Sequence, residues 1–166
     1  MKKSLLLLSA LVWFAISTLA FAAEPSGFWQ TPAIAGVGRV HPLPKAALQP
    51  DAHATYKIVF NLTKAARNNS SVNPGLEHVA RAINAFASAG VHLDHLKFAV
   101  VIHGSATPMV MNNAAYQRKT GAANPDLALM DKLRAAGVKI YVCGQAVADF
   151  HIAYADVAPQ VTVSLS

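Results

Sequence analysis

The chain has 166 residues, a formal net charge of +6 and one cysteine, and 54% of its residues are hydrophobic. Its cations are scattered along the sequence, which is not typical of a nucleic-acid surface. A single cysteine excludes an internal disulfide, so packing alone must hold the fold together.

Residues 1–23 have the pattern of a cleaved signal peptide. Two lysines precede a mainly apolar run from Leu5 to Phe14, and cleavage is expected after Ala22 or Ala23. The alternative is an uncleaved anchor, because the same segment is about long enough to span a bilayer. We expect cleavage, a periplasmic location and no stable membrane association of the mature protein.

Residues 24–55 carry five of the nine prolines and show neither a helical nor a strand period. Phe28, Trp29 and Ile34 are too apolar for a solvated linker. We expect an extended arm that lies on a surface of its own chain or of a neighbour.

From residue 56 to the end, the pattern alternates between strands and helices. Asn73-Pro74 and Asn124-Pro125 are typical of helix starts, because asparagine caps free amide groups and proline suits the first helical position. The order predicts one α/β domain over 56–166, with a parallel sheet covered on both faces. The strands are expected at 56–62, 96–103, 138–143 and 161–165, and the helices at 74–89, 108–116, 125–136 and 145–154.

Cys143 ends the third expected strand and precedes a helix, and ligands of open α/β sheets bind beyond the carboxyl ends of the strands. A helix N-terminus stabilises a thiolate, which is the nucleophile in sulfur transfer. Gly144 is expected to leave space for a partner sulfur or a second backbone. The alternative is a buried, inert cysteine, since cysteine is among the most buried residue types.

His103 and Asn61 end neighbouring strands, so they are expected to share one crevice with Cys143. A histidine there can shift the thiol toward thiolate or receive its proton, and the alternative is a hydrogen bond at a strand end. The chain has seven histidines but no H-E-x-x-H or C-x-x-C motif. We expect no metal, although a site built from His103 and Cys143 stays open as a third possibility.

Several short runs together resemble the DsrE/DsrF-like proteins, in particular a branch with a signal peptide. They are V-N-P-G-L-E at 72–77, V-V-I-H-G at 100–104 and A-G-V-K-I-Y-V-C-G-Q-A at 136–146. The resemblance implies a three-layer α/β sandwich of flavodoxin-like arrangement, homotrimers or homohexamers, and sulfur relay without an organic cofactor. By position, Cys143 corresponds to the relay cysteine, while His103, Asn61, Gly104 and Gly144 are candidates for the crevice around it.

Two departures from the resemblance matter. Better-known relay members work in the cytoplasm, so the sulfur donor and acceptor of an exported chain are unknown. Relatives continue beyond the last strand with a helix and a strand, whereas this sequence stops at Ser166. Uncovered apolar sheet surface then predicts an oligomer or poor solubility.

Two hypotheses of function follow. The first is an exported sulfur carrier or transferase in which Cys143 accepts and passes sulfane sulfur as a persulfide. The second is a homo-oligomeric binding or scaffold protein with a structural cysteine and a crevice for a small ligand or metal.

Overall fold

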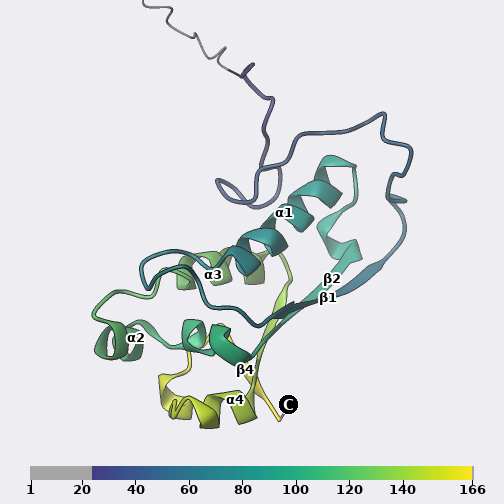
Figure 1. Ribbon diagram of the computed structural model, residues 1–166. Helices are drawn as coiled ribbons and strands as arrows, with labels where there is room; N and C mark the ends of the chain where they lie inside the picture. The colour runs from purple at the N-terminus through teal and green to yellow at the C-terminus, as the bar shows by residue number, and fades with distance from the viewer. Residues whose placement is uncertain (1–23, 166) are drawn as a thin grey trace, which may run out of the picture.

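The computed structural model describes residues 24–165 (Figure 1). The expected signal peptide therefore lies outside the described residues. The strands are β1 (Tyr56–Leu62), β2 (Leu96–Ile102), β3 (Lys139–Cys143) and β4 (Thr162–Ser164). The α-helices are α1 (Pro74–Ser88), α2 (Asn113–Thr120), α3 (Leu127–Ala135) and α4 (Gly144–Asp149), and short 3-10 helices are η1 (Leu93–His95), η2 (Gly104–Val110) and η3 (Tyr154–Asp156).

The four strands form one all-parallel sheet in the order β1-β2-β3-β4. Leu62 pairs with Ile102, Ile102 with Val142 and Val142 with Val163, so one register runs across the whole sheet. This confirms the predicted α/β class and the parallel sheet. It also brings the carboxyl ends of all four strands to one edge.

One face of the sheet carries the hydrophobic core. Phe98, Val100 and Ile102 on β2 are at most 2% exposed, and α1 and α3 lie side by side on this face (Figure 1). Leu76 on α1 and Leu133 on α3 are fully buried. Each such side chain contributes about 1.5–3 kcal/mol relative to leaving it in water.

The opposite face is only partly covered by the described residues. Val59 is 69% exposed, Lys97 is exposed, and Val101 and Tyr141 are half-buried. The sequence predicts cover on both faces of β2, because its residues are nearly all apolar. The structure instead places Ala99 and the other odd-numbered residues of β2 on the less buried side, opposite the buried even-numbered residues.

The two expected helix starts behave differently. Asn73 caps α1 as predicted, since its Oδ1 accepts from the Gly75 amide at 2.8 Å. Asn124 does not cap α3, which begins three residues later. Its buried Nδ2 donates instead to the carbonyls of Met109 and Met111, at 2.9 and 2.6 Å. Asn124 therefore holds η2 in place.

The arm is folded back on α1 rather than extended throughout. The buried Asn84 side chain makes five hydrogen bonds to arm residues 33–38, and its Oδ1 accepts from the Ile34 amide at 2.8 Å. Gln30 and Val40 exchange backbone hydrogen bonds of 2.8 Å that close this loop. The part of the arm nearest α1 is thus fixed by a residue of the domain. The boundaries of signal peptide, arm and domain stay predictions.

Within residues 24–165, none of the helices has the length and apolar character needed to cross a bilayer.

Candidate functional site

Cys143 is the last residue of β3 and pairs with Ser164 on β4. Side chains alternate along a strand, and its neighbours Ile140 and Val142 point into the core, at 3% and 0% exposure. The thiol, which is half-buried, therefore lies on the open face together with Tyr141. The cysteine is neither fully buried nor freely exposed.

His103 and Asn61 meet at the same edge of the sheet. His103 Nε2 lies 2.7 Å from Asn61 Oδ1, and the His103 amide donates to the Leu62 carbonyl at 3.0 Å. Both residues alternate with buried neighbours, so they share the open face with Cys143. Ile102 on β2 pairs with Val142 on β3. His103 and Cys143 are the next residues on these two strands.

The three residues therefore lie at one edge of the sheet, but the expected shared crevice is not seen: among the described residues, Asn61 lines one hollow and Gly144 another, and neither hollow is lined by His103 or Cys143. Among the described residues, no hydrogen bond joins His103 to Cys143. With Asn61 Oδ1 as the acceptor, Nε2 of His103 carries the proton, and a neutral ring then has Nδ1 as its acceptor. The pair fixes the ring and leaves one nitrogen able to take a proton.

Glycine is favoured at positions 144 and 104 because the backbone of other segments lies close to where a side chain would stand. A Cβ on Gly144 would stand 2.8 Å from the Ser164 carbonyl oxygen. Gly104 has φ +58°, and a Cβ there would stand 3.1 Å from the carbonyl oxygen of Thr63. Of the two groups expected against Gly144, a partner sulfur or a second backbone, the structure shows the second, because the backbone of β4 lies there. Both glycines let strands and loops pack closely around the edge.

A crevice of about 500 Å³ opens at the end of β1 and the start of α1. Its walls include Asn61, Lys64, Asn73 and His78. A second hollow, of about 350 Å³, lies beside Gly144, the residue next to the thiol. Asn61 therefore lies between the histidine that it holds and a space large enough for a small molecule.

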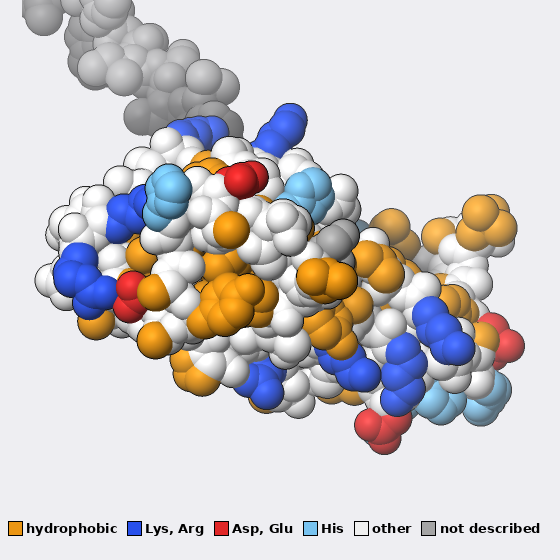
Figure 2. Space-filling model, turned by 90° about the horizontal axis from the view of Figure 1, so that it is seen from below, with side chains coloured by type: hydrophobic (Ala, Val, Ile, Leu, Met, Phe, Trp, Pro, Cys, Tyr) orange, Lys and Arg blue, Asp and Glu red, His pale blue; other side chains and the backbone are white. Residues whose placement is uncertain are grey.

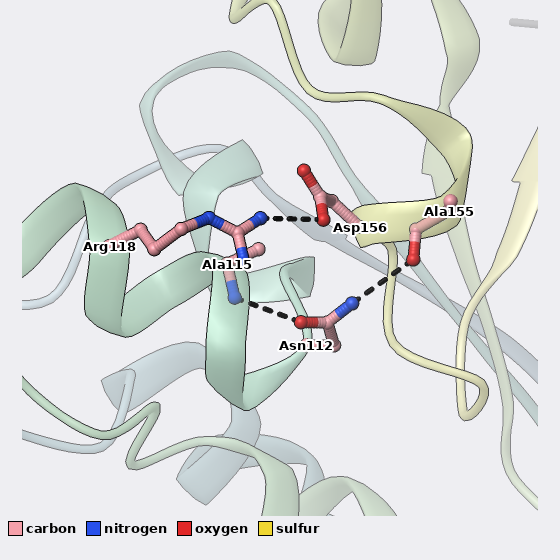
Figure 3. Close-up of polar contacts among 5 residues, drawn as sticks. All are labelled: Asn112, Ala115, Arg118, Ala155 and Asp156. Carbon is pink, nitrogen blue, oxygen red and sulfur yellow. Dashed lines mark hydrogen bonds and ion pairs between the residues drawn. The ribbon is translucent and has the colours of Figure 1, made fainter.

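Polar contacts fix the segment that returns the chain from α4 to β4 (Figure 3). Asn112 caps α2 by accepting from the Ala115 amide at 2.9 Å, and its Nδ2 donates to the Ala155 carbonyl at 3.1 Å. Arg118 Nη2 donates to Asp156 Oδ1 at 2.9 Å. These contacts tie η3 to α2. They thereby fix the path from Cys143 through α4 to its neighbouring strand β4.

Asp126 is a buried carboxyl group that the sequence patterns did not single out. It is 2% exposed, and its Oδ1 accepts from the Asn73 amide at 2.7 Å. Burial raises the pKa of Asp126 to about 6, the Asn73 hydrogen bond lowers it, and the charge of Glu77 raises it. The Asn73 side chain also donates to the Lys64 carbonyl at 2.9 Å. Asp126 therefore holds the backbone of Asn73, which lines the crevice.

Among residues 24–165, no group of three or more histidine, cysteine, aspartate or glutamate side chains is arranged to hold a metal ion. The possible site from His103 and Cys143 would thus have two protein ligands in the described part of the chain.

Asn84 and Asp126 are the structural residues that the sequence did not reveal. Their partners lie about fifty positions away, at Ile34 and Asn73, so no local pattern shows the pairing. The only local signal was that Asp126 follows Asn124-Pro125, in a segment already marked as a helix start.

The model of the DsrE/DsrF-like family matches residues 49–166. The search of curated proteins gives no match. The family match covers most of the chain, includes every residue of the site described above and associates the protein with sulfur relay in general terms. The chain belongs to the DsrE/DsrF-like family.

Proposed function

We propose that the protein is an exported sulfur carrier in which Cys143 accepts sulfane sulfur and passes it on as a persulfide. The observation that carries the proposal is the position of the thiol. Cys143 is half-buried on the open face, at the sheet edge that also holds the His103 and Asn61 pair. A sulfur carrier needs a thiol that a partner can reach and that solvent does not fully surround.

The transfer conserves electrons. The Cys143 thiolate attacks the outer sulfur of a donor persulfide, the donor S–S bond breaks as the new one forms, and the electron pair leaves with the donor thiolate. An acceptor thiolate then attacks the outer sulfur on Cys143 and releases the Cys143 thiolate. The reaction requires neither an oxidant nor an organic cofactor.

We assign to His103 the role of accepting the proton of the Cys143 thiol. Its ring is fixed at the edge by Asn61, and its second nitrogen can take the thiol proton directly or through a water molecule. Asn61 acts through His103 and is a positioning residue. Gly104 and Gly144 shape the backbone around the site.

Cold cyanolysis tests the carrier function, because cyanide removes sulfane sulfur as thiocyanate. The purified protein is incubated with polysulfide, desalted and treated with cyanide. We expect about one thiocyanate per chain for the native sequence and none for Cys143→Ser. Equal thiocyanate from both proteins would place the sulfur elsewhere and contradict the proposal.

Export to the periplasm rests on the amino-terminal sequence pattern, which lies outside the described residues. We expect that protein recovered from the cell envelope begins at Ala23 or Glu24, and that it is released without detergent. Intact mass and amino-terminal sequencing check this. A mature chain that retains Met1 would overturn it.

We also propose that the protein forms homotrimers or homohexamers, and that the arm supplies contact surface. Leu43 and Leu48 of the arm are 65% and 92% exposed, and a groove of about 920 Å³ lies between this segment and α1. Exposed apolar side chains of this size are typical of contact surfaces. Size-exclusion chromatography with light scattering tests it, and a monodisperse monomer would refute it.

A second candidate function is favoured by the crevice at Asn61, which has the size of a small-ligand site. The protein would then be an oligomeric binding protein, and Cys143 would be structural. Native and denatured alkylation separate the two functions. A thiol that reacts with iodoacetamide only after denaturation favours the binding protein, and a thiol that reacts in the native state favours the carrier.

A further inference from the structure

Three lysines form a row across the open face, at the opposite end from Cys143. Lys57 on β1 and Lys97 on β2 are direct partners in the register, and Lys139 on β3 pairs with Ala99, two residues along the same face. All three side chains are exposed. Adjacent strands lie about 4.8 Å apart, so the three charges are close neighbours.

Strand pairing does not favour this row. Like charges placed directly opposite each other destabilise a sheet. The four described strands carry no aspartate or glutamate, and no carboxylate pairs with the three lysines in the described part of the chain. In the described part of the chain, the row therefore has no ion-pair partner, and it lies on the less covered face of the sheet.

An apolar band separates the lysine row from the thiol. Val59, Ala99, Val101 and Tyr141 occupy the middle of the open face, and Cys143 follows at its carboxyl end. Figure 2 shows the side of the molecule away from α1, with hydrophobic side chains near its middle and lysine or arginine side chains at several places around them, one group of which stands beside acidic and histidine side chains. Lys139 and Cys143 lie four positions apart on one strand, which corresponds to about 13 Å.

We propose that this open face docks an acidic segment of a partner protein and directs the partner's reactive cysteine to Cys143. Carboxylates of the partner meet the lysine row, apolar side chains cover the band, and about four extended residues span the distance to the thiol. The inference deepens the proposed function, on which it rests, by assigning the chemistry of the sulfur donor or acceptor. A protein segment fits better than nucleic acid, because the face combines only three cations with an apolar centre.

Disulfide exchange with a synthetic peptide tests the docking. The probe carries three aspartates, a spacer of about four valine and glycine residues, and a terminal cysteine activated as a 2-pyridyl disulfide. The Cys143 thiolate attacks the peptide sulfur, the pyridyl S–S bond breaks, and pyridine-2-thione leaves and is followed by its absorbance. The control peptide has asparagine in place of each aspartate.

We expect the acidic peptide to react about tenfold faster than the neutral one at low ionic strength, with the advantage falling as salt is added. Lys57→Gln, Lys97→Gln and Lys139→Gln together should remove the advantage and leave the neutral peptide unchanged. The matched control is Lys45→Gln, Arg67→Gln and Lys132→Gln, which removes the same charge elsewhere and should keep the advantage. Equal rates for the two peptides, or equal loss in both variants, would overturn the proposal.

Two further measurements give the test its selectivity. An oligothymidylate of the same charge should compete poorly with the acidic peptide, and equal competition would show that the face attracts any polyanion, which contradicts the proposal. Cyanolysis after polysulfide loading is run on the same samples. If Cys143 takes up sulfur but the acidic peptide reacts no faster than the neutral one, the docking alone is overturned. If the acidic peptide reacts faster but Cys143 takes up no sulfur, the sulfur function is overturned and the docking stands.

Discussion

His103 Nε2 lies 2.7 Å from Asn61 Oδ1, across the gap between the ends of two paired strands. A histidine at a strand end would otherwise rotate freely about two bonds. With Asn61 Oδ1 as the acceptor, the contact selects one ring orientation and one tautomer.

Removal of His103 should slow sulfur uptake more than it changes the fold. We expect His103→Ala to lower the rate of Cys143 persulfidation at neutral pH by at least about tenfold, since general base catalysis contributes factors of this size or more. Asn61→Ala should lower the rate less and change its pH profile, because it frees the ring without removing it. Identical pH profiles for Asn61→Ala and the native protein would contradict the positioning role.

Replacement of Lys97 by glutamate should raise the stability of the fold and weaken the docking of the acidic peptide. Lys97→Glu converts the like-charge pair with Lys57 into an opposite-charge pair, so we expect a gain of about 0.5 kcal/mol in the free energy of unfolding. The same variant should lose the rate advantage of the acidic peptide. Urea denaturation measures the first effect, with Arg67→Glu as the control. A loss of stability would show that Lys97 has a structural partner.

Gly144→Ala should weaken the contact between β3 and β4. The new Cβ would stand 2.8 Å from the Ser164 carbonyl oxygen, which is backbone and cannot move alone. We expect a loss of about 1–3 kcal/mol, as for other overpacked sites. Gln145→Ala, at the next and exposed position, is the control and should be neutral. Thermal unfolding compares the two, and equal melting temperatures would refute this reading of Gly144.

Asn84 should be the main anchor of the arm. Asn84→Ala leaves the backbone groups of residues 33–38 without their partner, at a cost of about 2–4 kcal/mol. Ser88→Ala removes one hydrogen bond to its own helix and is the control. Limited proteolysis followed by mass spectrometry should show faster cleavage in the arm of Asn84→Ala alone. Unchanged cleavage would mean that other contacts hold the arm.

Asp126 gives the protein a pH dependence of defined sign. Its pKa is about 6 in the folded state, above the ordinary value of 3.8, so its contribution to stability is full below about pH 4 and is lost as the pH rises through 6. Asp126→Asn should therefore be more stable than the native protein at pH 7.5, by roughly 1–2 kcal/mol, and lose this advantage near pH 4. Urea unfolding at the two pH values measures it, and an advantage that grows toward low pH would have the wrong sign.

The sequence predicted the elements that local chemistry decides. Asn73 and Pro74 specify the start of α1 within a few residues, and the strand at 56–62 has the predicted bounds. Asn124-Pro125 carries the same local signal, yet the Asn124 side chain bonds to carbonyls more than ten positions away. A sequence pattern cannot distinguish these two outcomes, because the competing acceptors are defined by tertiary structure.

In the candidate site too, the contacts that depend on tertiary structure could not be predicted from the sequence. Parallel topology was enough to predict that Asn61, His103 and Cys143 share an edge, since all three end strands. The lysine row was not predicted, because only the register shows that Lys57 and Lys97 are partners. Nor does the sequence decide between a partner sulfur and a second backbone at Gly144, which depends on how closely Ser164 approaches.

Intact mass spectrometry of the native protein after incubation with polysulfide tests the central claim most directly. We predict that the chain gains the mass of one sulfur atom, that dithiothreitol removes it, and that Cys143→Ser gains nothing. A native protein whose mass stays unchanged under conditions in which a small thiol is fully converted would contradict the assignment of Cys143 as a sulfur carrier.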